Sequence, residues 1–395
     1  FYNCSLVEEI TLSDGITLIS DYAFDKCSLI SKFNSKNATE LIVPLSCVSI
    51  GEYAFKDMAL ITNVIVNDSV ESIGEGAFNG CNNLSGKLVI PSTVTKIGYD
   101  MYSSGAFADT SITSVEIKDG SEGLTINGST FKNCKMLESV SLSDRIVSIG
   151  YYAFENDSNL SSVEFKEVQS NLTIGNSAFH NTAIKEVKLP SKTKTIGRYA
   201  FKDCAKLEKI EFNEGLTSIG ESAFTNCTSL GGVINIPSTV TLIETSYGNG
   251  AFYNTDIFGV VIADGNSGIN IGVNAFNGCK KLVYADLSNR VTNIGYGAFK
   301  DDTSLQWVKI KKDNYDLSID TYAFQNAKSL EKISIPKRTT IKSSTFKGCT
   351  GLKNVYYSGS EKDYSNYVSV NEYENSAYKK ATLTYNYTDY DTWGV

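Results

Sequence analysis

Phenylalanine recurs along the chain at a nearly constant interval. Fifteen phenylalanines are spaced 22 to 31 residues apart, with Ala directly before twelve of them and Ile five positions before nearly every one. These residues are Phe1, Phe24, Phe55, Phe78, Phe107, Phe131, Phe154, Phe179, Phe201, Phe224, Phe252, Phe276, Phe299, Phe324 and Phe346. A short unit can bury its apolar side chains only by stacking on its neighbours, and a period of about 20–50 residues is typical of such repeat architectures. The pattern predicts a repeat solenoid of about fifteen units, in which Phe, Leu, Val and Ile form columns.

Each repeat predicts one short β-strand and a second extended or turn segment. Val nine positions after the Phe and Ile or Leu eleven positions after it share one side of an extended segment, such as 139–143 after Phe131. Pro91 and Pro336 follow such segments and end them, because proline cannot donate a hydrogen bond to a sheet. The V-x-x-I-G segment before the next Phe, such as 291–295, carries a glycine that permits a turn. We expect this second segment on the opposite wall.

The intervals between the phenylalanines occur twice in the same order. From Phe55 they are 23, 29, 24, 23, 25 and 22 residues, and from Phe201 they are 23, 28, 24, 23, 25 and 22 residues. This agreement predicts a duplication of six units, with one block at about 55–200 and the other at about 201–345. Both blocks belong to one predicted solenoid domain over residues 1–356.

The last stretch, 357–395, breaks the pattern. The phenylalanines stop and tyrosines take their place, with Trp393 near the end. The tyrosines are Tyr364, Tyr367, Tyr373, Tyr378, Tyr385, Tyr387 and Tyr390. A solenoid ends on an apolar cross-section that needs an atypical covering, so we expect 357–395 to form a Tyr-rich C-terminal cap. Binding of a sugar or a peptide by these aromatic residues is the alternative.

Composition narrows the classes of function. The chain is 42% hydrophobic and 20% charged, and no apolar run approaches the ~20 residues of a membrane-spanning helix, so we expect a large core and no membrane span in this segment. A net charge of −8 without a basic cluster makes nucleic acid a poor partner. A single histidine leaves little for His-based catalysis or metal binding. We therefore expect that the chain is not an enzyme and that it binds neither a cofactor nor a metal.

Eight of the nine cysteines share one position, three residues after the Phe, which we call the Cys column. They are Cys4, Cys27, Cys81, Cys134, Cys204, Cys227, Cys279 and Cys349. Other units carry Ala, Met or Thr there, so the position selects small volume and we expect free, buried thiols. Two pairs lie one unit apart and leave a disulfide open, Cys4 with Cys27 and Cys204 with Cys227. No C-x-x-C motif occurs, which argues against zinc.

Three further residues at turn positions could carry chemistry. Asp157 and Asp302 replace the column cysteine at equivalent places in the two blocks. Because Asp accepts backbone hydrogen bonds in turns, we expect a turn-capping role, and a calcium site is the alternative. His180 follows Phe179 directly, and no motif places an acid or a nucleophile beside it, so it is expected to be a surface residue.

Repeated I-G-x-x-A-F-x-x-C-x-x-L units that close with Y-Y-S-G-S-E-K-D-Y at 356–364 resemble the BspA-like class of leucine-rich repeats over nearly the whole chain. The resemblance implies a right-handed, curved, β-rich leucine-rich repeat. It also implies large proteins of bacteria and some protozoa, often secreted or on the cell surface, for which adhesion to host proteins is the usual proposal. The matching positions are all core positions, so they name no ligand. Two units depart from the family pattern, because extra residues at 98–106 and 244–250 bulge out before the Phe.

Only the outward positions of the predicted strands can contact a ligand and determine which ligand binds, because the other positions form the core. Eight residues after the Phe, Tyr284 and Trp307 fall on adjacent rungs, and ten residues after it the same rungs carry Asp286 and Lys309. Tyr356 continues this second column two rungs later. Aromatic residues that point outward from a sheet are effective binding anchors, so these five residues are the candidate ligand contacts. Packing of Trp307 against its neighbours is the favoured interpretation of this residue. Contact with a ligand is the alternative, and for that role the aromatic pair is expected to be exposed to water.

Two functions from different classes follow. The first is a non-enzymatic cell-surface or secreted protein that mediates protein–protein or protein–glycan interaction, in adhesion to host or neighbouring cells. Its partner would be a protein or glycan, with host extracellular matrix as one source. The alternative is a structural spacer or stalk with no ligand on this segment. Because the chain opens inside a repeat, on Phe1, and lacks the features of a signal peptide, we expect a longer precursor and an extracellular or cell-surface location.

Overall fold

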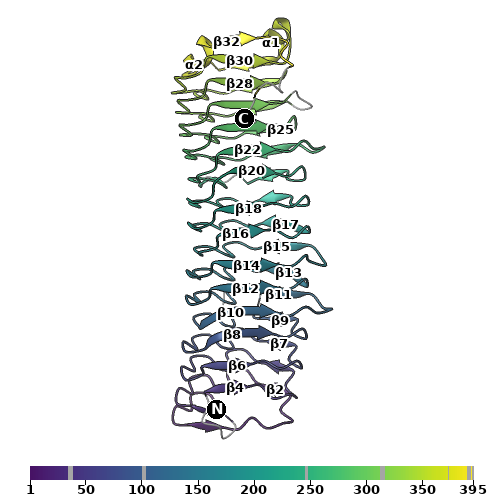
Figure 1. Cartoon of the computed structure of the whole chain (residues 1–395), viewed down its shortest axis with the longest axis vertical. Helices are drawn as coiled ribbons and strands as arrows, with labels where there is room; N and C mark the ends of the chain where they lie inside the picture. The colour runs from purple at the N-terminus through teal and green to yellow at the C-terminus, as the bar shows by residue number, and fades with distance from the viewer. Residues whose placement is uncertain are drawn as a thin grey trace. The chain divides into compact units, whose positions relative to one another are not determined.

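Short parallel β-strands, stacked rung on rung, occur along nearly the whole length of the chain. The computed structural model describes residues 1–33, 39–99, 104–244, 248–311, 316–371, 373–388 and 393. These residues form a parallel β-solenoid of about fifteen turns with little helix. They divide into two compact units, Phe1–Cys204 and Ala205–Val395, and Figure 1 labels their strands in chain order. The predicted repeat solenoid is confirmed.

Each repeat of the first unit contributes to two walls. The V-x-x-I-G segments form what we call the Ile-Gly wall, and the segments after the Cys column form the Val-Ile wall. The Ile-Gly wall contains β2 (Leu18–Ile19), β5 (Ser49–Ile50), β7 (Ser72–Ile73), β9 (Lys96–Ile97), β11 (Leu124–Ile126), β13 (Ile146–Ile149), β15 (Leu172–Ile174) and β17 (Thr193–Ile196). The Val-Ile wall contains β1 (Glu9–Ile10), β3 (Lys32–Phe33), β4 (Glu40–Ile42), β6 (Asn63–Ile65), β8 (Ser85–Ile90), β10 (Ser111–Ile117), β12 (Ser139–Leu142), β14 (Ser162–Phe165) and β16 (Glu186–Lys188).

The second unit repeats the two walls and adds two short helices. Its Ile-Gly wall contains β19 (Ser218–Ile219), β21 (Leu242–Ile243), β23 (Ile269–Ile271), β25 (Val291–Ile294), β27 (Leu317–Ile319), β29 (Thr339–Ile341) and β31 (Val368–Val370). Its Val-Ile wall contains β18 (Lys209–Glu211), β20 (Val233–Ile236), β22 (Gly259–Ile262), β24 (Tyr284–Leu287), β26 (Trp307–Ile310), β28 (Lys332–Ile335), β30 (Asn354–Tyr357) and β32 (Thr382–Thr384). The helices are α1 (Glu361–Tyr367) and α2 (Ser376–Lys380).

Strand register aligns equivalent residues of successive repeats. In the first unit, Ser139 of β12 pairs with Ser162 of β14, and Val140 pairs with Val163. The valines are buried while the serines are exposed, as the alternation of apolar and polar positions predicts. The V-x-x-I-G segments, for which a strand or a turn was expected, also form strands.

The phenylalanines stack in a continuous column inside each unit, which we call the Phe column. Neighbouring rings in Phe1–Cys204 have centroids 5.1 to 5.7 Å apart and lie close to parallel. In the second unit the column runs from Phe224 to Phe346 with spacings of 5.2 to 5.4 Å. Tyr378 of α2 then stacks on Phe346 at 5.2 Å, so its ring covers the last phenylalanine. Tyr390 lies outside the described residues.

A left-handed backbone turn follows each Phe. It explains which residue types occur two positions after the Phe, where the repeat motif specifies none. The residue two positions after the Phe has a positive φ, for example 62° at Asn133 and 65° at Asn156. Asn, Asp and Gly tolerate this backbone region better than other residues, which is why they dominate the position. Side chains at this position also bond from rung to rung. We call this series the Asn ladder: Asn133 donates to Asp109 at 3.0 Å, Asn156 to Asn133 at 3.1 Å and Asn181 to Asn156 at 3.0 Å.

The Cys column does more than fill small volume. All nine cysteines are free thiols, and those of the column are buried except Cys4, which is only partly buried. The thiol of Cys134 donates to the carbonyl oxygen of Phe107, one rung back, at 3.2 Å, and Cys81 donates to Phe55 at 3.1 Å. Burial is therefore confirmed, but a weak S–H donor between rungs is a second reason for cysteine here.

Each block contains one arginine that is buried against backbone carbonyls. Arg145 is 2% exposed, and its guanidinium donates to the carbonyl oxygens of Pro91, Val94 and Lys118 at 2.9, 2.5 and 2.9 Å. Arg290 makes the equivalent bonds to Pro237, Val240 and Ala263. Each arginine thus ties together the loops of the long repeat in its block. In the predicted bulges, residues 100–103 and 245–247 lie outside the described residues.

Candidate functional site

Two aromatic side chains on neighbouring rungs of the second unit form a stacked pair. Tyr284 of β24 and Trp307 of β26 are paired in strand register, and their ring centroids are 4.8 Å apart with an interplanar angle of 17°. Asp286 and Lys309 are paired on the same strands, and Lys309 Nζ lies 2.6 Å from Asp286 Oδ2. The expected adjacency of these four residues is confirmed, while their contact with a ligand stays a prediction.

The expectation of exposure to water, which ligand contact requires of the aromatic pair, is wrong, and packing of Trp307 against its neighbours is confirmed. Tyr284 is only 4% exposed and Trp307 only 6%. Trp393 packs edge-on against Trp307, with centroids 6.0 Å apart at 87°, and Phe258 packs edge-on against Tyr284 at 5.8 Å. Tyr356, the fifth candidate, also contacts Trp393, at 5.2 Å. The repeat period carries no information about where the C-terminal segment runs, so no residue was expected above the pair.

The covering tryptophan is held by polar as well as apolar contacts. Its indole Nε1 donates to the hydroxyl of Tyr387 at 2.5 Å, and Lys332 Nζ lies 4.8 Å from the centroid of its ring. An ammonium group over an indole face is attracted by the ring quadrupole. Burial raises the pKa of Tyr284, and the negative charge of Asp286 adds to this shift, so the phenol stays protonated. The site thus combines neutral aromatic rings with the ammonium group of Lys332 and the Asp286–Lys309 ion pair.

The corresponding face of the first unit is open. A hollow of about 360 Å³ lies over β8, β10, β12 and β14. The side chains that line this serine hollow are Lys87, Ser114, Val115, Glu116, Ser139, Val140, Ser141, Ser162 and Glu164. Lys87 Nζ forms an exposed ion pair with Glu116 Oε2 at 2.5 Å, and this hydrogen bond lowers the pKa of Glu116. Small hydroxyl side chains, with charges at the margin, therefore replace the aromatic rings of the second unit.

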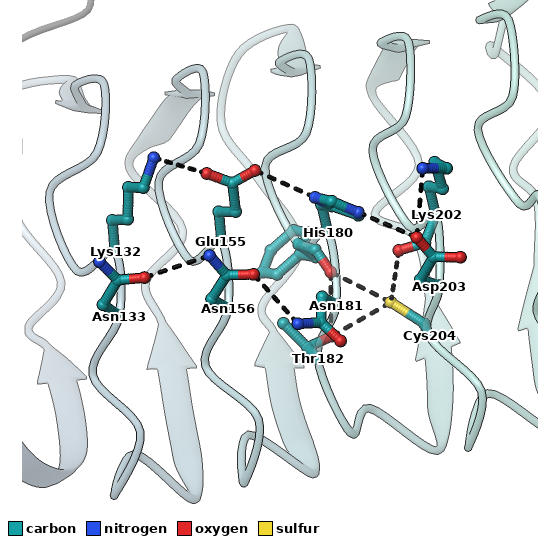
Figure 2. Close-up of polar contacts among 11 residues, drawn as sticks. Lys132, Asn133, Glu155, Asn156, His180, Asn181, Thr182, Lys202, Asp203 and Cys204 are labelled. Atoms are coloured by element: carbon teal, nitrogen blue, oxygen red, sulfur yellow. Dashed lines mark hydrogen bonds and ion pairs between the residues drawn. The ribbon is translucent and has the colours of Figure 1, made fainter.

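His180 lies between two carboxylates, contrary to the expectation of an ordinary surface residue. Its Nδ1 is 3.0 Å from Glu155 Oε1 on the preceding rung, and its Nε2 is 3.1 Å from Asp203 Oδ2 on the following rung (Figure 2). Lys132 and Lys202 extend the row at its ends, with Nζ 2.7 Å from Glu155 and 3.2 Å from Asp203. The imidazole side chain is 23% exposed. The row therefore links four successive rungs through polar side-chain contacts.

The charged row around His180 binds rungs together and offers no nucleophile. Carboxylate oxygens only accept hydrogen bonds, so both contacts of His180 are hydrogen bonds when both ring nitrogens carry a proton. The neighbouring Cys204 thiol donates to the carbonyl of Phe179, and burial raises its pKa to about 11. The row could have been found from the sequence, because Lys132, Glu155, His180 and Lys202 all directly follow a Phe.

Family comparison decides which class of repeat this is. The family model described as BspA type Leucine rich repeat region (6 copies) matches residues 1–105, 100–171, 124–247 and 245–376. The chain belongs to the BspA-type leucine-rich repeat family. The resemblance noted in the repeat motif is thereby confirmed.

One solved structure supports this fold, and a second shares sequence with the chain over most of its length. A leucine-rich repeat protein from Bacteroides ovatus ATCC 8483 has a TM-score of 0.60 and 22% identity, covering 95% of this BspA-type chain and 91% of that protein. A leucine rich cell surface protein from Faecalibacterium prausnitzii A2-165 has a TM-score of 0.38 and 20% identity, covering 93% of this chain and 91% of that one. No curated protein matches the chain. The first likeness shows the leucine-rich repeat fold.

Two buried carboxyl groups of the BspA-type repeat cap backbone groups across rungs. Asp157 Oδ1 accepts the backbone N–H of Cys134 at 2.7 Å, and Asp302 Oδ1 accepts that of Cys279 at 2.8 Å. Both side chains are fully buried, and burial holds the pKa of each carboxyl well above its usual value. The capped N–H belongs to the preceding rung, whereas a local turn was expected. For the calcium alternative, no cluster of three His, Cys, Asp or Glu suited to a metal ion is found among the described residues.

The helices of this BspA-type chain are short. α1 has seven residues and α2 has five. Within the described ranges, no helix is long and apolar enough to cross a membrane.

Proposed function

We propose that this BspA-type chain is a non-enzymatic interaction protein whose Val-Ile wall binds a protein or a glycan, in adhesion to host or neighbouring cells. The difference between the two duplicated blocks at outward positions carries this proposal. The core residues Val163 and Val308 are identical, whereas beside them the outward Ser162 corresponds to Trp307. Folding of the repeat does not require a particular residue at the outward position, so recognition can determine it.

The serine hollow has the chemistry of a polar recognition surface. Serine hydroxyls both donate and accept hydrogen bonds, and Lys87, Glu116 and Glu164 add both signs of charge at the margin. A rigid sheet holds these groups in fixed register, which lowers the entropy lost on binding. Stacked repeats present such extended faces to macromolecular partners. Membership of the BspA-type family supports an extracellular or cell-surface location for this role.

The test is binding of the full chain to a panel of immobilised fibronectin, laminin, collagen and mucin. Ser139→Arg and Glu164→Arg each place a long cation in or beside the serine hollow. Thr173→Arg is the matched control, because Thr173 is exposed on β15 of the Ile-Gly wall in the same unit.

We expect saturable binding to one member of the panel, weakened at least tenfold by Ser139→Arg or Glu164→Arg and unchanged by Thr173→Arg. No saturable binding to any member would contradict the adhesion proposal and favour a spacer. Equal weakening by all three variants would contradict the assignment to the Val-Ile wall.

A further inference from the structure

The aromatic cluster of the second unit has features of an occupied binding site. We call Tyr284, Trp307, Lys332, Tyr356 and Tyr387 the aromatic seat, and its occupant is Trp393. Four of the five seat residues lie on the neighbouring strands β24, β26, β28 and β30 of the Val-Ile wall, where Trp307 pairs with Lys332 and Ser334 with Tyr356. None of them belongs to the Phe column or the Cys column. The repeat core therefore does not need this cluster.

Trp393 is held by ring contacts, a cation–π contact and a hydrogen bond from its indole N–H. The edge-on contacts with Trp307 and Tyr356 have centroid distances of 6.0 and 5.2 Å, with interplanar angles of 87° and 67°. Edge-to-face packing matches the positive edge of one ring to the negative face of another, so it is specific for an aromatic side chain. Lys332 adds a cation–π contact, and Tyr387 accepts the indole N–H. As a result, Trp393 is only 5% exposed.

The two blocks carry different side chains on this face. At the positions equivalent to Tyr284 and Trp307, the first unit carries Ser139 and Ser162, which are exposed. An indole would find there neither the ring contact that Trp307 offers nor the Tyr284 ring stacked behind it. The seat is therefore a local addition to one block, at the outward positions where recognition is proposed.

We propose that the aromatic seat is a binding site for the tryptophan side chain of a peptide, and that Trp393 of the same chain occupies it in cis. A partner peptide with an accessible tryptophan competes with Trp393 for the seat. This inference rests on the proposed binding role of the Val-Ile wall and adds a ligand class and a means of control to it. The serine hollow is open, whereas the seat accepts a partner only when Trp393 leaves.

The test uses the full chain with Trp393→Ala and a synthetic peptide with the sequence of residues 387–395. The chain has only two tryptophans, so the variant keeps Trp307 as the single intrinsic reporter. Binding is measured by fluorescence anisotropy of the labelled peptide and by emission of Trp307 with an unlabelled peptide whose tryptophan is replaced by 4-fluorotryptophan, which is essentially non-fluorescent. A peptide with Ala at the tryptophan position is the control ligand, and Trp307→Ala combined with Trp393→Ala is the control protein.

We expect the peptide to bind the Trp393→Ala chain saturably and at least tenfold more tightly than it binds the natural chain. The Ala peptide and the double variant should show no saturable binding. Equal affinity for the natural and Trp393→Ala chains would overturn the proposal, as would no binding to a Trp393→Ala chain whose circular dichroism is native. A natural chain that sediments as a dimer while the variant is a monomer would also overturn it, because the occupant would then be a second copy.

A second measurement applies if Trp393→Ala does not fold. The natural chain labelled with 5-fluorotryptophan gives two ¹⁹F resonances, and excess unlabelled peptide should move the Trp393 resonance to its solvent-exposed position. A resonance that does not respond to saturating peptide would contradict competition at the seat. Failure here leaves binding at the serine hollow unaffected, since that is tested with Ser139→Arg and Glu164→Arg in the other unit.

Discussion

Glu155 and Asp157 lie two residues apart in one turn, and the pKa values of their carboxyl groups shift in opposite directions. Burial acts to raise the pKa of Glu155, but hydrogen bonds and charge from Lys132 and His180 outweigh it, so the net shift is downward. Asp157 is also desolvated but receives only the backbone N–H of Cys134, so its pKa rises. Its Oδ2 has no hydrogen-bond partner among the described residues. The pKa values of two carboxyl groups in the same turn therefore shift in opposite directions because only Glu155 has ionic partners.

Glu155→Gln should destabilise the chain by about 1 kcal/mol at pH 7, because Lys132 and His180 lose a charged partner in a partly buried site. A carboxyl whose folded pKa is lowered contributes stability above its unfolded value of about 4.3, and that stability is lost as the pH falls through the folded pKa. The difference in thermal midpoint between the natural chain and the variant should therefore shrink below about pH 4. A difference that is equally large at pH 3 would contradict this account.

Asp157→Asn should stabilise the chain at pH 7, whereas Glu155→Gln should destabilise it. A raised folded pKa means that the folded state binds the proton more tightly, so Asp157 costs stability increasingly as the pH rises above its unfolded value of about 3.9. Asn keeps the acceptor for Cys134 and cannot ionise, so the variant should be more stable than the natural chain by about 1–3 kcal/mol at pH 7, with little gain at pH 3. Urea denaturation at both pH values measures this. Asp302→Asn in the other unit should behave alike, and a loss of stability at pH 7 in both variants would sink the prediction.

Arg145→Met should destabilise the first unit by about 2–4 kcal/mol, because buried carbonyl oxygens of the long repeat lose charged donors. Hydrogen exchange should report faster exchange in peptides around Pro91, Val94 and Lys118. Arg290→Met is the matched variant in the second block, where the equivalent carbonyls should be affected. Exchange that increases uniformly over the chain, or not at all, would be inconsistent with a local clamp.

Phe131→Ala should cost about 3–5 kcal/mol, the usual range for truncating a fully buried Phe. Because the ring stacks on Phe107 and Phe154 at 5.7 and 5.2 Å, the loss of hydrogen-exchange protection should centre on these neighbouring rungs. Thr173→Ala, on an exposed strand position, is the control and should leave protection unchanged. Unaltered protection around Phe131 in the variant would contradict the stacked column.

The core could be predicted from the sequence because each core residue recurs. Phe131, Val140 and Leu142 all lie at offsets that recur in most repeats, and stacking makes one offset one place in space. The same reasoning could have found the row through Glu155 and His180, since both directly follow a Phe. The repeat motif specifies no residue type at this offset, so the motif alone does not predict the row.

The cover over the aromatic pair could not be predicted in this way. Tyr284 and Trp307 were placed side by side by their shared offset, which strand register confirms. Trp393 lies outside the repeats, and its contact with Trp307 depends on the path of a segment that occurs once. A non-repeating segment has no equivalent rung from which its position can be inferred, so the exposure that ligand contact requires of the pair was wrongly expected.

Recognition by the outward face of the Val-Ile wall is the central claim, and site-specific photo-crosslinking tests it most directly. A photoreactive benzoylphenylalanine replaces Ser139 on β12 in one chain and Thr173 on β15 in another, and each chain is irradiated with the partner that the binding panel identifies. Both positions are exposed and belong to the same unit, on opposite walls. The account predicts a covalent adduct from position 139 and none from position 173. An adduct from position 173 alone, or from neither position under saturating partner, would contradict it.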